Sequence, residues 1–289
     1  MKTLEALQRD MDTATDLQSI VRTMKVLAAV SIRQYEKALA SLTDYNRTVE
    51  MGLQAVLRNH RSAASGRVQT PLRTGAIVFG SDHGLCGRYN ESIAAFAIEA
   101  LENADDRRIL AVGSRIEAAL RARGEDVEQL FFVPGSVTGI TSTVQNLLLR
   151  IDDWRQAGVE RVLLFHNVHE QKTAYRAQRR ELLPIDPSRF NSSRDRPWPS
   201  RSLPVFTMDS GELLRALIRQ HLFIVLFSAC AESLAGEHAS RLISMQVAEK
   251  NIQQRLETLT STYRQQRQNQ ITEELLDVVS GFEALGGEL

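Results

Sequence analysis

The sequence predicts a long antiparallel coiled coil of N- and C-terminal helices with a central α/β domain. The first observation is the uneven distribution of helix-breaking residues. The first glycine is Gly52, the first proline is Pro71, and no proline follows Pro204. Between Glu212 and Ser280 only Gly236 interrupts the chain. Both ends of the protein can therefore form unusually long helices.

The second observation is an apolar stripe at helical spacing near each end of the chain, as expected for a coiled-coil seam. A helix of about 55 residues would be roughly 80 Å long, whereas a domain of about 100 residues has a radius of gyration near 13 Å. Such helices extend beyond a globular body, and their apolar stripes are most simply removed from water if the two helices pack against each other. The stripes comprise Leu4, Leu7, Met11, Ala14, Leu17, Val21, Met24, Ala28, Tyr35, Leu39, Leu42, Val49, Leu53 and Val56, then Leu242, Met245, Ile252, Leu256, Leu259 and Tyr263, and finally Ile271, Leu275, Val278 and Phe282.

The third observation is an alternation of strand and helix patterns between the ends, which predicts βαβ units and a Rossmann-like, largely parallel sheet. A further run at 173–185 can supply an edge strand, and 186–202 reads as an exposed basic loop. The strands are expected at 74–80, 108–113, 130–133 and 160–167, and the helices at 91–103, 114–123 and 139–157. The domains are then 1–59 (N-terminal coiled-coil helix), 73–209 (central α/β domain) and 210–289 (C-terminal coiled-coil helix).

Composition excludes several functional classes. Lys plus Arg (35) equals Asp plus Glu (35), and this balance argues against nucleic-acid binding. Cys86 and Cys230 have no CxxC spacing, which indicates a reduced chain without a zinc site. The N-terminus has no apolar signal core. The run Leu222–Ala231 covers about half a membrane span and is expected to be a buried helix segment.

No motif forms a persuasive catalytic or cofactor site. No glycine precedes a lysine, so a Walker-type phosphate loop is missing, and the turn Gly80–Gly87 also lacks the GxGxxG spacing. We interpret its glycines as serving tight turning and Cys86 as a packing residue. His166 and His169 lie three apart on an expected strand and point to opposite faces, which disfavours a metal site. We therefore expect no cofactor and no metal.

The polar segment 264–270 (RQQRQNQ) interrupts the C-terminal stripe without a helix breaker. The helix continues there but loses its apolar face. Two interpretations stay open: a solvated surface, or a surface that polar groups of other chains contact reversibly.

Four segments resemble the gamma subunit of rotary F-type ATP synthases. SDHGLCGRYN (81–90) is similar to the signature S-D-R-G-L-C-G-G-L-N, which follows the first strand of the middle domain. GEHASRLISMQ (236–246) and TYRQQRQNQITEELLDVVSGFEAL (262–285) resemble E-x-A-S-R-M-x-A-M and R-Q-x-x-I-T-x-E-L-x-E-I-V-S-G-A-x-A-L. QSIVRTMKVLAAVSIR (18–33) resembles Q-K-I-T-K-A-M-x-M-V-A-A-S-K-M. His83, Arg88 and Tyr89 depart from the signature, which indicates a divergent branch.

This resemblance implies a non-catalytic central rotor shaft that couples transmembrane ion flow to ATP synthesis or hydrolysis. Its implied partners are the alpha and beta subunits, the epsilon subunit and the membrane c-ring, with no nucleic acid and no direct small-molecule substrate. The implied location is the cytoplasmic face of the inner (plasma) membrane. Carried over by position, the implied contacts with the alpha/beta ring are Met24, Arg241, Arg267, Gln268 and Thr272, and the signature turn supplies Asp82, Gly84, Leu85, Cys86 and Gly87.

Two alternatives remain from the residues alone. One is a structural coiled-coil interaction protein with an α/β insert. The other is a small-molecule enzyme on the α/β body that uses the glycine turn around Cys86.

Overall fold

The computed structural model describes residues 3–59, 73–102, 104, 106–170, 174–185 and 205–286. Helix α1 spans Leu4–Asn59 and helix α6 spans Ser210–Gly286. The chain divides into a larger unit, residues 28–241, and a smaller unit, residues 1–27 and 242–289. Each long helix therefore contributes to both units, and the three-part division at 59/73 and 209/210 stays a prediction.

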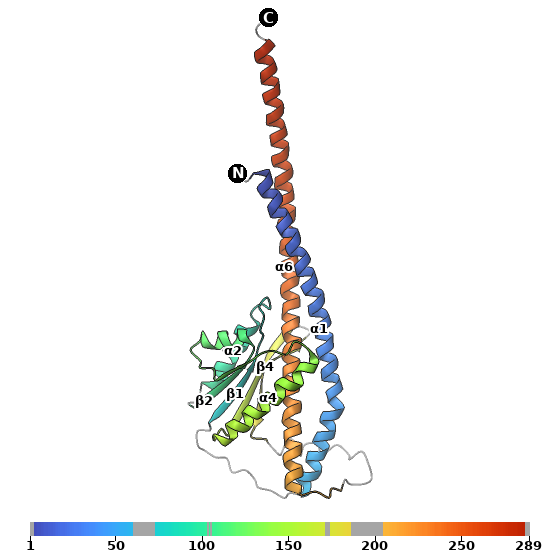
Figure 1. Ribbon diagram of the computed structural model, residues 1–289, viewed down its shortest axis with the longest axis vertical. Coiled ribbons are helices and arrows are strands. Elements are labelled where there is room, and N and C mark those ends of the chain that lie inside the picture. The colour runs from blue at the N-terminus through green and yellow to red at the C-terminus, as the bar shows by residue number, and fades with distance from the viewer. Residues whose placement is uncertain are drawn as a thin grey trace. The chain divides into compact units, whose positions relative to one another are not determined.

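The larger unit is built on a five-stranded sheet in the order β3-β2-β1-β4-β5 (Figure 1). Strands β1 to β4 are parallel, and β5 pairs antiparallel with β4 at the edge, as its sequence predicts. Ile77 in the middle of β1 pairs with Leu110 of β2 and Leu164 of β4. The strand bounds are Thr74–Phe79 (β1), Arg107–Val112 (β2), Gln129–Phe131 (β3), Arg161–Glu170 (β4) and Ala174–Leu183 (β5).

Helices cover both faces of this sheet, because successive strand residues point to opposite sides. Ile77 and Phe79 pack in a core with α4 (Val137–Gln156) and with residues of α1 and α6. Ala76 and Val78 pack in a second core with α2 (Tyr89–Leu101) and α3 (Ser114–Arg121). The expected strands and short helices are all confirmed, with bounds shifted by up to three residues at their ends.

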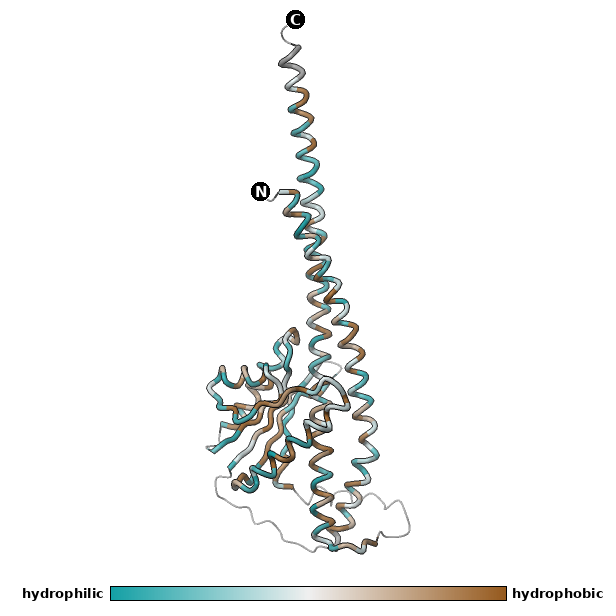
Figure 2. Tube along the Cα trace, viewed as in Figure 1, coloured by the Kyte–Doolittle hydropathy of each residue, from teal (hydrophilic) through white to brown (hydrophobic). Residues whose placement is uncertain are grey.

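The most apolar part of α6 belongs to the first core. Leu226, Ala229 and Cys230 are fully buried there, as expected for the run Leu222–Ala231. Figure 2 shows that hydrophobic residues are also concentrated along the strands of the sheet. By length and composition α6 also contains a window apolar enough to cross a membrane, with 28% of that window buried. The apolar run lies within a protein core, so we interpret it as a core helix.

The two long helices run antiparallel within each unit. In the larger unit Tyr35 stacks on His238, with ring centroids 5.8 Å apart, and the Tyr45 hydroxyl donates to Gln220 at 2.9 Å. From the first contact to the second, the residue number increases along α1 and decreases along α6, so the two helices run in opposite directions. The predicted antiparallel pairing of the terminal helices is confirmed here.

The smaller unit shows the same direction of pairing through polar contacts. The Gln18 amide donates to Gln253 at 2.8 Å, and Lys25 forms an ion pair with Glu249 at 2.5 Å. The expected seam is wrong at Leu17 of α1, and Ile271, Leu275 and Val278 of α6 are exposed as well. Leu17 is 48% exposed, whereas its neighbour Gln18 is buried. The hydrogen bond to Gln253 allows the amide to take the inward place, because it satisfies a polar group that burial would otherwise leave unpaired.

Candidate functional site

The signature turn, residues 80–88, connects the carboxyl end of β1 to the start of α2. Leu85 and Gly87 both have left-handed backbone conformations, with φ of 63° and 61°. Glycine adopts this conformation without strain, whereas leucine rarely does. The Leu85 side chain is also 60% exposed. The surrounding contacts must therefore hold the turn in place.

Asp82 is the first of these contacts. Its Oδ1 accepts a hydrogen bond from the Ser114 amide and its Oδ2 accepts one from the Val133 amide, each at 2.8 Å. The Ser114 and Val133 amides belong to the segments that follow β2 and β3. One carboxylate thus joins the loops after three neighbouring strands at the same edge of the sheet.

A buried network forms the inner side of the turn. The Ser81 amide donates to Asn90 Oδ1 at 2.9 Å, and Asn90 Nδ2 donates to Ser81 Oγ at 2.8 Å. The Cys86 thiol is 2% exposed and lies 3.7 Å from Asn90 Nδ2. Burial raises the pKa of this thiol, so it stays protonated and is a poor nucleophile. Cys86 is a packing residue, as expected from the sequence.

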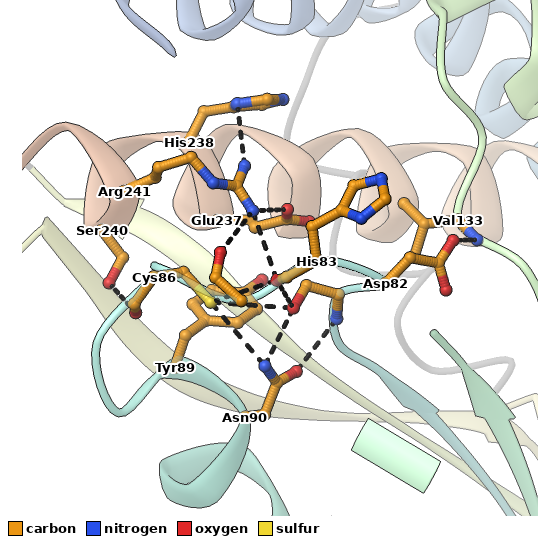
Figure 3. Close-up of polar contacts among 12 residues, drawn as sticks. Asp82, His83, Cys86, Tyr89, Asn90, Val133, Glu237, His238, Ser240 and Arg241 are labelled. Carbon is orange, nitrogen blue, oxygen red and sulfur yellow. Dashed lines mark hydrogen bonds and ion pairs between the residues drawn. The ribbon is translucent and has the colours of Figure 1, made fainter. Parts of the chain in front are cut away.

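Helix α6 crosses the turn and holds it from the other side (Figure 3). Ser240 Oγ donates to the Cys86 carbonyl at 2.6 Å, and the Tyr89 hydroxyl donates to the Ser233 carbonyl at 2.6 Å. The Arg241 guanidinium lies 3.4 Å from the carbonyl oxygens of both His83 and Gly84. Ser240 and Arg241 therefore hold the backbone of the turn on α6, and Tyr89 joins the start of α2 to the α6 backbone.

The charge of Arg241 is balanced within the same helix. Its guanidinium donates to Glu237 Oε1 at 2.6 Å, and both residues are buried. Burial raises the pKa of Glu237, and the neighbouring Arg241 opposes that rise. A buried ion pair is tolerated when further hydrogen bonds satisfy its donors, and the turn carbonyls meet this requirement.

His238 completes the arrangement as a neutral imidazole. Burial, with Arg241 as a second cause, lowers its pKa to about 4. Its Nδ1 lies 3.4 Å from Arg241 Nη1 and accepts the hydrogen bond in the neutral state.

The same helix fills the place where open α/β sheets bind ligands. That place lies beyond the carboxyl ends of the strands, where the strand order reverses. Here the reversal lies between β1 and β4. A Cβ added at Gly236 of α6 would come within 3.3 Å of the Asn167 carbonyl oxygen of β4. Together with Ser240 on the Cys86 carbonyl, this contact leaves the crevice occupied by the protein's own helix.

A second polar cluster lies between the sheet and α6. His166 Nε2 is 2.7 Å from Glu232 Oε2, and Arg180 pairs with the same carboxylate at 3.0 Å. Burial lowers the pKa of His166. Within the described ranges no group of three or more His, Cys, Asp or Glu side chains could hold a metal ion.

The other predicted contact residues differ from Arg241. Met24 is half-buried, and Arg267, Gln268 and Thr272 are exposed. The Thr272 hydroxyl donates to the Gln268 carbonyl at 2.9 Å. Arg267 has no ion pair with any residue that the structure describes. These four positions belong to the smaller unit, while Arg241 belongs to the larger one.

Comparison with known proteins identifies the family. A family model described as ATP synthase matches residues 3–285. The chain belongs to this ATP synthase family. The ATP synthase gamma chain of Bdellovibrio bacteriovorus is 26% identical over 304 aligned residues, covering 99% of this chain and 100% of the relative. The gamma chain of a Synechococcus species is 28% identical over 316 aligned residues, with the same coverage.

Solved structures agree on the fold. The rotor of the Euglena gracilis mitochondrial ATP synthase matches with a TM-score of 0.63 at 13% identity, covering 93% of this chain and 98% of that one. The central stalk of the Tetrahymena thermophila mitochondrial ATP synthase matches with a TM-score of 0.57 at 20% identity, covering 79% and 99%.

Sequence reasoning missed the residues that join the two ATP synthase signatures. Tyr89, Asn90, Glu237 and Ser240 lie within the quoted motifs, but the sequence does not show that these motifs contact each other. The signal was the pairing of an acidic and a basic residue at i and i+4, Glu237 and Arg241, close to the apolar run of the same helix. A buried pair of this kind needs additional partners, and the turn supplies them.

Proposed function

We infer that this chain is the gamma subunit of an ATP synthase, the central rotor shaft that couples transmembrane ion flow to ATP synthesis or hydrolysis. The observation that carries the inference is the match of the family model over residues 3–285, which includes both long helices and the α/β body. Relatives named gamma chain align with 99% of the chain. The shaft performs no chemistry itself.

The exposed end of α6 is the surface on which the shaft acts. Ile271 is 48% exposed, Leu275 61% and Val278 57%. These side chains recur at helical spacing and so lie on neighbouring turns, and a contiguous exposed apolar patch marks an interaction site. In the assembled enzyme the alpha and beta subunits surround this end. Because the shaft is asymmetric, each rotational position stabilises a different conformation of each catalytic site, and rotation becomes a difference in nucleotide affinity.

We propose that four residues contact the ring during rotation: Met24, Arg267, Gln268 and Thr272. The exposure of Arg267, Gln268 and Thr272 supports this role, since a side chain that forms and breaks contacts must be accessible in the isolated shaft, and half-buried Met24 keeps part of its surface accessible. Arg241 was expected to make such a contact too. Its burial and its bonds to the signature turn favour a positioning role, in which it fixes α6 on the α/β body.

The remaining partners follow from the same assignment. The α/β body contacts the epsilon subunit and the membrane c-ring, and the complex lies on the cytoplasmic face of the plasma membrane. Of the two alternatives, an enzyme on the α/β body is disfavoured by the filled crevice and the protonated Cys86 thiol. A purely structural coiled-coil role does not account for the family match.

The test is to assemble the complex with variants and measure ATP hydrolysis and ion transport side by side. We expect Met24→Lys, Arg267→Ala and Thr272→Val to lower the ratio of transport to hydrolysis. A contact worth about 1.4 kcal/mol changes a rate about tenfold. Arg108→Ala is the control, because Arg108 is exposed at the start of β2 and lies outside both long helices. Unchanged ratios in all three variants would contradict the assignment of these contacts.

A further inference from the structure

A cavity opens in the larger unit where the end of α4, the end of β5 and the beginning of α6 meet. Its volume is about 790 Å³, within the range of about 300–1,000 Å³ typical of small-molecule sites. Leu148, Val159, Leu183 and Leu222 line it and are themselves buried. Its floor is therefore apolar and is contributed by all three elements.

Arginine side chains surround this floor. Arg155 comes from α4, and Arg215 and Arg219 come from α6. Arg219 forms an ion pair with Asp152 at 3.1 Å. The side chains of Arg155 and Arg215 form no hydrogen bond or ion pair with any described residue. Both are exposed, so water solvates them and a ligand can reach them.

The local charge favours an anion. Three arginines face the cavity against two carboxylates, Asp152 and Glu160, and Asp152 is already paired. An arginine guanidinium offers planar donors that match a carboxylate or phosphate in two-bond geometry. Arginines on the rim beside an apolar floor favour a ligand that has both an anionic group and an apolar chain.

We propose that this cavity binds an amphipathic anion, with its alkyl chain on the apolar floor and its carboxylate or phosphate head held by Arg155 and Arg215. The same chemistry is presented by a free long-chain carboxylate and by the acyl and phosphate groups of an anionic lipid. The site does not depend on the rotor function, because none of its residues is among the proposed ring contacts.

The test is calorimetric titration of the full chain with dodecanoate below its micellar concentration. We expect saturable binding with a stoichiometry near one. Arg155→Gln and Arg215→Gln should each weaken it about tenfold, the effect of losing about 1.4 kcal/mol. Ala216→Trp should abolish it by filling the cavity without changing its charge. Arg108→Gln, which removes an exposed arginine elsewhere, should leave it unchanged.

Two further arms identify the ligand and can overturn the proposal. Dodecanol has the same chain without the charge and should bind at least tenfold more weakly; equal binding would refute an anion site. Co-sedimentation with vesicles containing phosphatidylglycerol, lost in both arginine variants, would assign the head to a lipid. Binding of dodecanoate without such co-sedimentation would assign a free carboxylate. Binding of neither, or binding insensitive to Arg155→Gln, Arg215→Gln and Ala216→Trp, would refute the proposal.

Discussion

Two stretches of the single helix α6 have opposite environments. In the stretch 222–241 Leu226 is fully buried and Arg241 is 7% exposed. In the stretch 267–281 all described side chains are exposed, Leu275 by 61%. The residue types are similar, with leucine, valine, serine and charged residues in both. The difference lies in what covers them.

The first stretch is covered by its own chain and the second is not. A buried leucine contributes roughly 1.5–3 kcal/mol relative to an exposed one, so the first stretch stabilises the α/β body. Leu275, Leu276, Val278 and Val279 gain nothing of this kind within the chain, because each is more than half exposed. Their burial requires other chains. The stretch 222–241 thus serves folding, and the stretch 267–281 serves assembly.

The largest expected effect separates two arginines of this helix. Arg241→Ala should destabilise the chain by about 3–5 kcal/mol, because it leaves Glu237 buried without its partner. Arg267→Ala should cost about 0.5 kcal/mol or less, since Arg267 is exposed. Urea-induced unfolding of both variants measures the difference.

A double variant sharpens this comparison. Glu237→Gln combined with Arg241→Met should cost less than Arg241→Ala alone, since no buried charge is then left unpaired. Equal stability of Arg241→Ala and Arg267→Ala would show that the contact between α6 and the signature turn does not stabilise the fold.

A smaller effect concerns pH and again distinguishes the buried stretch. Burial lowers the pKa of His238 from 6.5 to about 4. Below pH 6.5 the unfolded chain therefore binds a proton that the folded chain does not. Stability is complete above pH 6.5 and falls as the pH drops toward 4, by up to about 3 kcal/mol from this group.

The measurement is urea unfolding at several pH values between 4 and 7 for the original chain and for His238→Gln. The variant should lose stability less steeply as the pH falls. His166, whose pKa is also lowered, adds to the loss in both chains, and Glu237, whose pKa is raised, opposes it in both. The difference between the two curves therefore reports His238. Parallel curves would contradict a neutral His238.

The last prediction is that no nucleotide binding is detected. Because α6 fills the crevice at the strand ends, the isolated chain should bind no Mg-ATP at micromolar nucleotide. Calorimetric titration measures this, with a nucleotide-binding subunit of the complex as the positive control. Saturable heat with a stoichiometry near one would restore the enzyme alternative.

Much of this fold is visible in the sequence, because its signals are local. The absence of prolines and glycines and the spacing of apolar residues predict the long helices, and the alternation of short apolar runs predicts the parallel sheet. The extended run at 173–185 predicts the edge strand, which the structure forms at Ala174–Leu183. The signature turn is equally local, and its glycines and Asp82 lie between β1 and α2. Leu17 shows the limit of a prediction from periodicity. The pattern favours Leu17 as the buried position, but its neighbour Gln18 is buried instead because its amide forms a hydrogen bond with Gln253.

The sequence by itself determined which segments are helical, which are strands, and which family the motifs resemble, because each depends on neighbouring residues. Only the tertiary structure decided that the signature at 81–90 packs against the one at 236–246, that Arg241 is buried rather than exposed like Arg267, and that α6 closes the ligand crevice. The physical reason is that a sequence pattern records that a side chain tends to be buried or polar. It does not record which side chain, distant along the chain, covers it or completes its hydrogen bonds.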